Sequence, residues 1–179
     1  MLFGPDPHGD SALARAHTLA VNNQARLSVV QVIDEILPNT KLMDRVMSPV
    51  NLQAKIVEVH QSALRERVTS LSSNIEINTE VLVGIPFLEI IRGVLRNDHD
   101  LVIKMSEGDG LMDRVFGSDD MHLLRKCPCP VWLVKPGLPE SYDRIMAAVD
   151  VNDGYPPEEL DTRRLLNQQI LELASALQS

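Results

Sequence analysis

The chain has 179 residues, a length sufficient for the buried core of one domain and a remainder. Its 44% of hydrophobic and 23% of charged residues are ordinary for a globular protein. Its formal net charge of −8 argues against the basic face that sequence-independent binding to nucleic acid or an anionic membrane requires. No hydrophobic run approaches the roughly 20 residues that span a bilayer, and a secretory signal pattern is lacking, so we expect a cytoplasmic protein.

The first part of the chain alternates between helix and strand patterns. Asp10 or Ser11 can cap a first helix, whose inner stripe is Leu13, Ala16, His17 and Ala20. Residues 25–34 are rich in β-branched side chains and short enough to form a strand. A long amphipathic helix is expected at residues 52–71, with an apolar side made of Ile56, His60, Leu64, Val68 and Leu71. We interpret His60 as a boundary residue of that helix rather than a ligand.

The alternation continues through the middle of the chain. Residues 75–83 predict a strand, and Pro86 stands where a proline suits the first turn of a helix that runs to residue 96. Residues 100–105 and 130–135 are short apolar runs typical of fully buried parallel strands. This order of elements predicts an α/β fold with a doubly wound parallel sheet.

The C-terminal part predicts a second, incomplete unit. Residues 137–143 have the composition of a linker, residues 144–150 predict a new strand, and residues 160–177 predict an amphipathic helix. A lone strand and helix cannot cover their own edge and apolar stripe, so this unit needs a surface to dock on.

Two cysteines, Cys127 and Cys129, flank Pro128 ahead of the predicted strand at residues 130–135. A zinc site of the finger or ribbon type needs a second pair of Cys or His ligands, which the sequence does not supply, so we expect no metal. We interpret the cysteines as small apolar residues that enter the strand. A thiol or metal sensor is the alternative.

Catalytic chemistry has little support in the residue spacing. The five histidines stand on separate predicted elements, and no Ser-His-acid or Cys-His arrangement can be read from their spacing. The adjacent acids Asp119 and Asp120 are interpreted as a solvated helix start that complements the helix dipole. We therefore expect that the chain is not an enzyme.

Two strings carry a family resemblance: HDLVIKM at residues 99–105 and HLLRKCPCPVWLVKP at residues 122–136. They resemble the universal stress protein (UspA) family, in particular the first domain of its tandem-domain E-type members. The resemblance implies a flavodoxin-like, HUP-type sheet of five parallel strands over residues 1–136, with a shortened first strand. It also implies that residues 144–179 are the opening strand and helix of an incomplete second domain of the same kind.

Nucleotide-binding members of this family carry the motif Gly-x2-Gly-x9-Gly-(Ser/Thr) after the fourth strand. Glycines let backbone amides approach phosphate oxygens, and the last pair opens a helix whose N-terminus favours an anion. Gly117 and Ser118 match the final pair, but counting back places Lys104 and Glu107 where the other two glycines should stand. If ATP or AMP binds, the resemblance implies that its site is made of Asp6, Val32, Met105, Gly108, Gly117 and Ser118.

Acidic residues outnumber basic ones around this loop. The acids Glu107, Asp109, Asp119 and Asp120 would face a phosphate, and Lys104 and Arg114 offset only part of their charge. We therefore expect a non-enzymatic stress-response protein that acts through protein contacts, has a degenerate nucleotide loop and holds no cofactor. The alternative is an ATP- or AMP-binding module whose loop is re-registered on Gly108 and Gly117.

A self-association surface is also implied by the resemblance. Members of the family pair through the edge of the last strand, here Val131–Val134, between subunits or between tandem domains. We expect a homodimer or a tandem-domain pair, with no nucleic acid and no membrane as partner.

Overall fold

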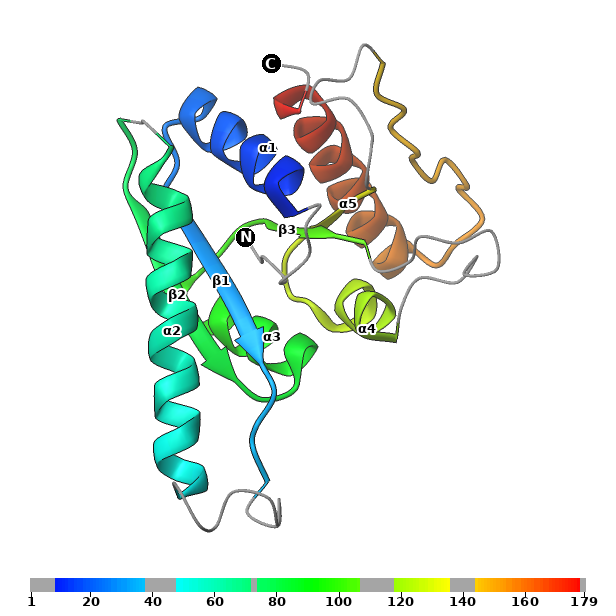
Figure 1. Ribbon diagram of the computed structural model, residues 1–179. Coiled ribbons are helices and arrows are strands. Elements are labelled where there is room, and N and C mark those ends of the chain that lie inside the picture. Colours follow the sequence, from blue (N-terminus) through cyan, green and yellow to red (C-terminus); the bar gives the residue numbers. More distant parts are fainter. Residues whose placement is uncertain (1–8, 38–47, 72–73, 107–117, 136–143, 178–179) are drawn as a thin grey trace. The chain divides into compact units, whose positions relative to one another are not determined.

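The computed structural model describes residues 9–37, 48–71, 74–106, 118–135 and 144–177. Helices and strands alternate along these residues as the sequence predicts (Figure 1). In chain order they are α1 (Gly9–Asn22), β1 (Leu27–Ile33), α2 (Pro49–Thr69), β2 (Ile77–Val83), α3 (Pro86–Asn97), β3 (Val102–Met105), α4 (Ser118–Lys126), β4 (Val131–Val134) and α5 (Pro157–Ala176). The chain divides into two compact units, Met1–Leu138 and Pro139–Ser179, and each is described by itself.

The strands of the first unit form two parallel pairs. β1 pairs with β2 from Leu27 opposite Ile77, and β3 pairs with β4 from Val102 opposite Val131. The parallel pairing confirms the coarser part of the prediction, an α/β fold with parallel strands. Five strands were expected in one sheet, whereas the described residues contain four strands in two pairs, and the predicted first strand, which would end at Asp6, lies outside them.

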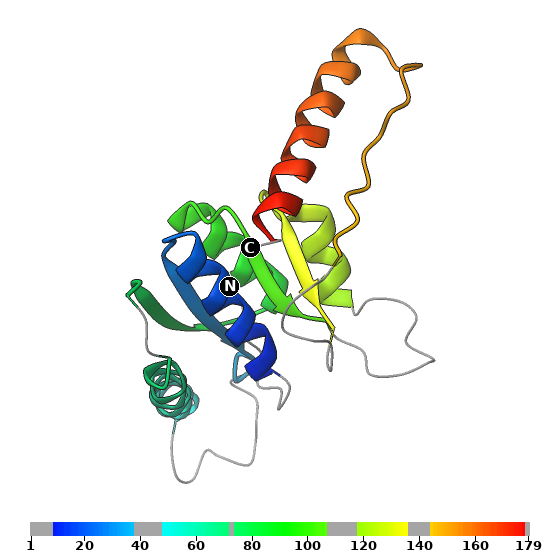
Figure 2. The same cartoon turned by 90° about the horizontal axis from the view of Figure 1, so that it is seen from above.

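Helices cover both faces of the strands, as in a doubly wound arrangement. α1 and α2 contribute to one hydrophobic cluster, together with Val29 of β1 and Ile103 of β3. α3 and α4 contribute to a second cluster, with Val30 of β1 and Val102 of β3. Because neighbouring residues of one strand belong to different clusters, the clusters lie on opposite faces. The view from above shows α1 on one side of the strands and α3 and α4 on the other (Figure 2).

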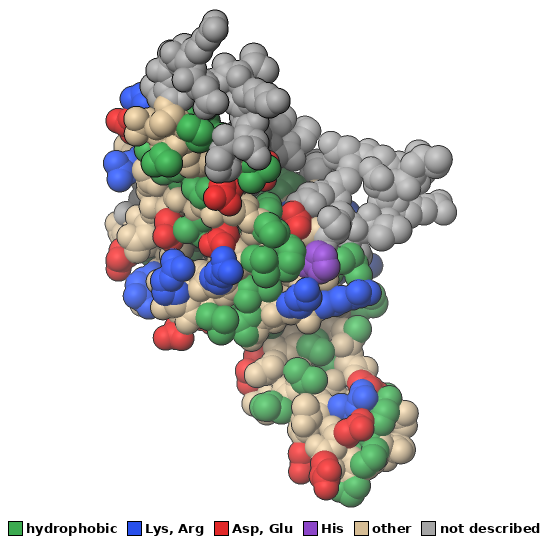
Figure 3. Space-filling view, turned by 90° about the horizontal axis from the view of Figure 1, so that it is seen from below, with side chains coloured by type: hydrophobic (Ala, Val, Ile, Leu, Met, Phe, Trp, Pro, Cys, Tyr) green, Lys and Arg blue, Asp and Glu red, His purple; other side chains and the backbone are tan. Residues whose placement is uncertain are grey.

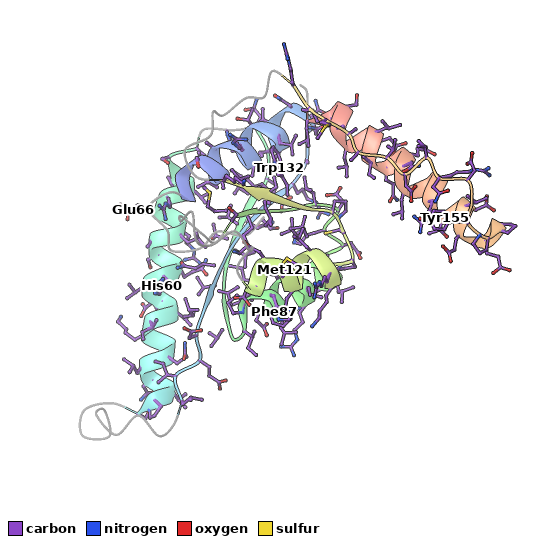
Figure 4. All side chains as sticks on the ribbon, turned by 90° about the vertical axis from the view of Figure 1, so that its right-hand side faces the viewer. His60, Glu66, Phe87, Met121, Trp132 and Tyr155 are labelled. Atoms are coloured by element: carbon purple, nitrogen blue, oxygen red, sulfur yellow. The ribbon has the colours of Figure 1, made fainter. Side chains whose placement is uncertain are left out.

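Helix α2 illustrates how local sequence sets the boundaries. Ser48 caps it, since its hydroxyl accepts a hydrogen bond from the amide of Asn51, and Pro49 occupies the first helical turn. The helix therefore begins three residues before the predicted position. Its apolar side faces the strands as expected, with Leu64 buried at 2% exposure and His60 half-buried at the boundary (Figure 4).

The connection from β2 to α3 needs a glycine. Gly84 has φ of 142°, which side-chain-bearing residues rarely adopt, and its amide donates a hydrogen bond to the carbonyl of Ile33 at the end of β1. Pro86 then opens α3, and Asp98 ends it in the left-handed conformation with φ of 51°. The turn thus brings the carboxyl end of β1 close to the start of α3.

The predicted strand at residues 144–150 is not formed, which corrects that expectation for the second unit. A strand needs a neighbour for its backbone hydrogen bonds, and no strand of the described residues pairs with this segment. Instead, the side-chain amide of Asn167 on α5 bonds both the N–H and the carbonyl of Asp150, at 3.0 and 2.6 Å. Helix α5 is present, and none of its residues is buried.

No helix in the described ranges combines the length and apolarity needed to cross a bilayer.

The two neighbouring leucines of α4 provide a test of this architecture. Leu123 is fully buried in the second cluster, whereas Leu124 is 45% exposed. We expect Leu123→Ala to lower the free energy of unfolding by about 2–5 kcal/mol, because it removes buried methyl groups and leaves a cavity. Leu124→Ala should change it by less than about 1 kcal/mol. Urea unfolding followed by circular dichroism measures both, and equal losses would contradict the assigned face of α4.

Candidate functional site

The carboxyl ends of β1 and β3 form the edge at which the family resemblance would place a nucleotide, if one binds. Strand β3 ends at Met105, and the next amide, that of Ser106, donates a hydrogen bond of 2.8 Å to the carbonyl of Val134. Helix α4 begins at Ser118, the predicted start after the loop. The predicted site residues Asp6, Gly108 and Gly117 lie outside the described residues.

Two other predicted site residues lie at this edge but on opposite faces. Met105 is 8% exposed and packs in the cluster formed with α1. Val32 packs against the other cluster, which holds Leu123 of α4. The structure therefore places both residues at the carboxyl ends of their strands, as the resemblance implies, without bringing their side chains together around one space.

A buried ion pair joins β3 to α4 at the same edge. Nζ of Lys104 lies 2.8 Å from Oδ1 of Asp120 and 3.3 Å from the carbonyl oxygen of Met105. The Lys104 side chain is 10% exposed, and that of Asp120 is fully buried. Removing two charges from water costs several kcal/mol, so such a pair persists only where its attraction and its other hydrogen bonds offset that cost.

The burial of Asp120 corrects the interpretation of the two acids as a solvated helix start. Asp119 is half-buried, and Asp120 has no exposure at all. Both stand in the first turn of α4, where the helix dipole favours negative charge. The sequence did carry a signal for this pair, since Lys104 interrupts a run predicted to be a fully buried strand, and a buried ammonium group needs a nearby anion.

A second buried cation lies on the other face of the strands. Arg15 of α1 is 4% exposed, and its guanidinium carbon lies 6.0 Å from the ring centre of Trp132 on β4 (Figure 4). This is the range of a cation–π contact. The contact anchors α1 to the β3–β4 pair.

Aromatic stacking fixes α4 against α3. The rings of Phe87 and His122 stack with their centres 4.4 Å apart and their planes 25° apart. Nζ of Lys126 lies 5.1 Å from the centre of the Phe87 ring, which Figure 4 labels beside Met121. His122 thus has a packing role between the two helices.

The cysteine pair favours the apolar interpretation. The sulfur atoms of Cys127 and Cys129 lie 3.7 Å apart, and both residues pack against the cluster of α3 and α4. Burial, followed by the neighbouring Cys127, raises the pKa of the Cys129 thiol to about 12. A thiol that stays protonated is a poor nucleophile and a poor metal ligand. Throughout the described part of the chain, no three His, Cys, Asp or Glu side chains gather as a metal site would require.

A pocket of about 540 Å³ opens at the opposite edge, near the amino ends of β1 and β2. Its lining includes Arg26, Glu80, Asp98, His99 and Asp100. Burial lowers the pKa of His99. Because the pocket lies at the amino rather than the carboxyl ends of the strands, it gives no support to the predicted nucleotide site.

In the second unit, an ion pair joins the segment before α5 to the helix itself. The carboxylate of Asp150 accepts a hydrogen bond from the Arg163 guanidinium. That guanidinium also lies 3.5 Å from the centre of the Tyr155 ring (Figure 4). The Asp150 carboxylate is therefore used within the chain itself.

The cysteine geometry leads to a test of thiol reactivity. We expect Cys129, examined in a Cys127→Ser variant, to react with iodoacetamide at pH 7.5 at least about tenfold more slowly than a free cysteine, since burial raises its pKa. The variant removes one contribution to that pKa, but burial, the larger cause, remains. Alkylation followed by mass spectrometry measures the rate, and a rate equal to that of free cysteine would favour the thiol sensor.

Comparison with known proteins shows the family. The model of the universal stress protein family matches residues 3–135. Universal stress protein E of Escherichia coli K12 is 39% identical over 90 residues, which are 50% of this chain and 28% of that protein. The universal stress protein E homolog of Haemophilus influenzae is 24% identical over 185 residues, 99% of this chain and 58% of that protein. The chain thus spans less than two thirds of the length of these relatives.

Solved structures agree in fold. The universal stress protein UspA from Lactobacillus plantarum is 23% identical, with a TM-score of 0.54 over 75% of this chain and 94% of that one. A universal stress protein in complex with cAMP is 17% identical, with a TM-score of 0.53 over 75% and 94% of the two chains. With the family model covering most of its length, the chain belongs to the universal stress protein family.

Proposed function

We propose that this chain is a non-enzymatic stress-response protein that acts through protein contacts and has a degenerate nucleotide loop. The observation that carries the proposal is the pair of carboxylates in the first turn of α4, of which Asp120 is fully buried. A phosphate at this helix N-terminus would meet like charge where the nucleotide-binding motif supplies glycine amides.

Exposed hydrophobic side chains support action through protein contacts. Ile85, just before α3, is 55% exposed, and Leu95 on α3 is 64% exposed. Leu124 on α4 is 45% exposed. Figure 3 shows hydrophobic side chains gathered among charged ones on one face of the described residues. Contiguous apolar surface with a polar surround is typical of protein interaction sites.

The alternative is an ATP- or AMP-binding module that uses Gly108, Gly117 and Ser118. The solved complex of a related fold with cAMP supports it. The two functions differ in what the wild-type chain binds.

We expect no binding of Mg-ATP or AMP to the wild-type chain, because the acidic start of α4 disfavours a phosphate. Isothermal titration calorimetry with both nucleotides at up to millimolar concentration measures this. The matched control is Gly117→Val, which should change nothing. Micromolar binding that Gly117→Val abolishes would refute the proposal and establish the alternative.

We also propose the domain organisation that the resemblance implies. Residues 1–136 would be one domain with a five-stranded sheet, joined by residues 137–143 to the opening part of a second domain at residues 144–179. The division of the structure after Leu138 supports this boundary. So does the match to the Haemophilus influenzae relative, which covers nearly the whole chain.

Self-association through β4 is the third part of the proposal. β4 pairs with β3 along one edge, where the carbonyls of Pro130 and Val134 accept hydrogen bonds from β3 and from Ser106. In a parallel ladder the bonding residues alternate, so the backbone of Val131 and Leu133 points to the other edge. On that edge the described residues contain no pairing strand.

We expect the wild-type chain to be a dimer and Leu133→Pro to be a monomer. Proline removes an N–H from the outer edge and leaves the ladder to β3 intact. Size-exclusion chromatography with light scattering measures the mass, and circular dichroism checks that the variant is folded. A wild-type monomer at high micromolar concentration, or a folded Leu133→Pro variant that remains dimeric, would contradict pairing through this edge.

A further inference from the structure

The end of β3 and the first turn of α4 contain a cation and an anion that the fold itself supplies. Nζ of Lys104 and Oδ1 of Asp120 are 2.8 Å apart, and the two side chains are 10% and 0% exposed. Lysine and aspartate are almost never this buried unless they are paired. The contact is therefore a fixed feature of the edge rather than a surface ion pair that solvent can replace.

Its position coincides with an anion site. Asp120 stands in the first turn of α4, where N–H groups and the helix dipole favour a negative charge. A nearby cation further stabilises a phosphate bound at such a place, because hydrogen bonds between charged partners are the stronger ones. Lys104 provides that cation from the end of the neighbouring strand β3. The Asp120 carboxylate already occupies both the cation and the start of the helix.

We propose that the Asp120 carboxylate is an internal substitute for a bound anion, held by Lys104 and by the start of α4. The substitution excludes phosphate groups from the carboxyl edge, because a second anion would face like charge at close range in a site that excludes water. The inference rests on the proposed loss of nucleotide binding and adds to it the two residues that determine that loss.

The test uses an external anion in place of the carboxylate. Asp120→Ala removes the negative charge beside Lys104 and vacates its volume. We expect this variant to bind inorganic phosphate and formate at least about tenfold more tightly than the wild-type chain does. The same anions should raise its melting temperature relative to chloride at matched ionic strength. Calorimetry and thermal unfolding measure the two effects.

Two variants serve as controls. Lys104→Met combined with Asp120→Ala should bind phosphate and formate no more tightly than the wild-type chain does, since the cation is gone. Asp119→Ala, which removes the neighbouring half-buried acid, should not tighten the binding of these anions. The inference is overturned if Asp120→Ala binds no more tightly than the wild-type chain, or if the double variant binds as tightly as Asp120→Ala.

Folding of the variant does not limit the test. Should Asp120→Ala fail to fold, Asp120→Ser, which also removes the charge and leaves room for a small anion, enters the same titrations, where a folded protein without any gain is again a negative result. Failure of both variants to fold even with phosphate or formate present also overturns the inference, because the external anion then does not replace the carboxylate. Binding of Mg-ATP to the wild-type chain would refute the proposed function separately, whatever the variants do.

Discussion

Helix α1 is the element on which the rest of the structure depends, because it packs across both strand pairs. Its buried face belongs to the cluster that also holds residues of β1 and β3; that face is Ala12, Leu13, Ala16 and Ala20. The described residues show no ladder between β1 and β3, so side-chain packing supplies this connection. Hydrophobic stabilisation scales with the apolar area removed from water, at roughly 25 cal/mol per Å². Three alanines keep the helix close to the strands and make that burial possible.

Helix α4 is fixed in a different way on the opposite face, by three kinds of contact. Leu123 is buried in the core, His122 stacks on Phe87 of α3, and Asp120 pairs with Lys104 of β3. Only the last of these carries a large desolvation cost, so the ion pair contributes no more to the free energy of unfolding than two hydrophobic residues often would. The pair instead fixes the position of α4, because the buried Asp120 charge must lie against Lys104 at the end of β3.

The sequence predicted most elements because hydrophobic periodicity and turn chemistry are local signals. Pro86 and the stripe that contains Leu64 placed two helices to within a few residues. The strand at residues 144–150 was wrong because a strand is completed by a neighbour, and local sequence does not contain that neighbour. The candidate site was predicted only in part for a similar reason. Val32 and Met105 are at the expected strand ends, whereas their faces, and the partner of Lys104, depend on tertiary packing.

The residues that pack α4 at this edge differ from those whose charges bear on the proposed loss of nucleotide binding. The helix that starts at Ser118 is held by Leu123 and His122, which face the core and α3 and would not touch a phosphate. Phosphate binding depends instead on backbone approach in the preceding loop and on the charge of the first helical turn. In the proposed function, the acid at position 120 is kept in the buried first turn by Lys104 and makes the start of the helix less favourable for a further anion. The packing of α4 in this chain thus involves other side chains than the charges at its start.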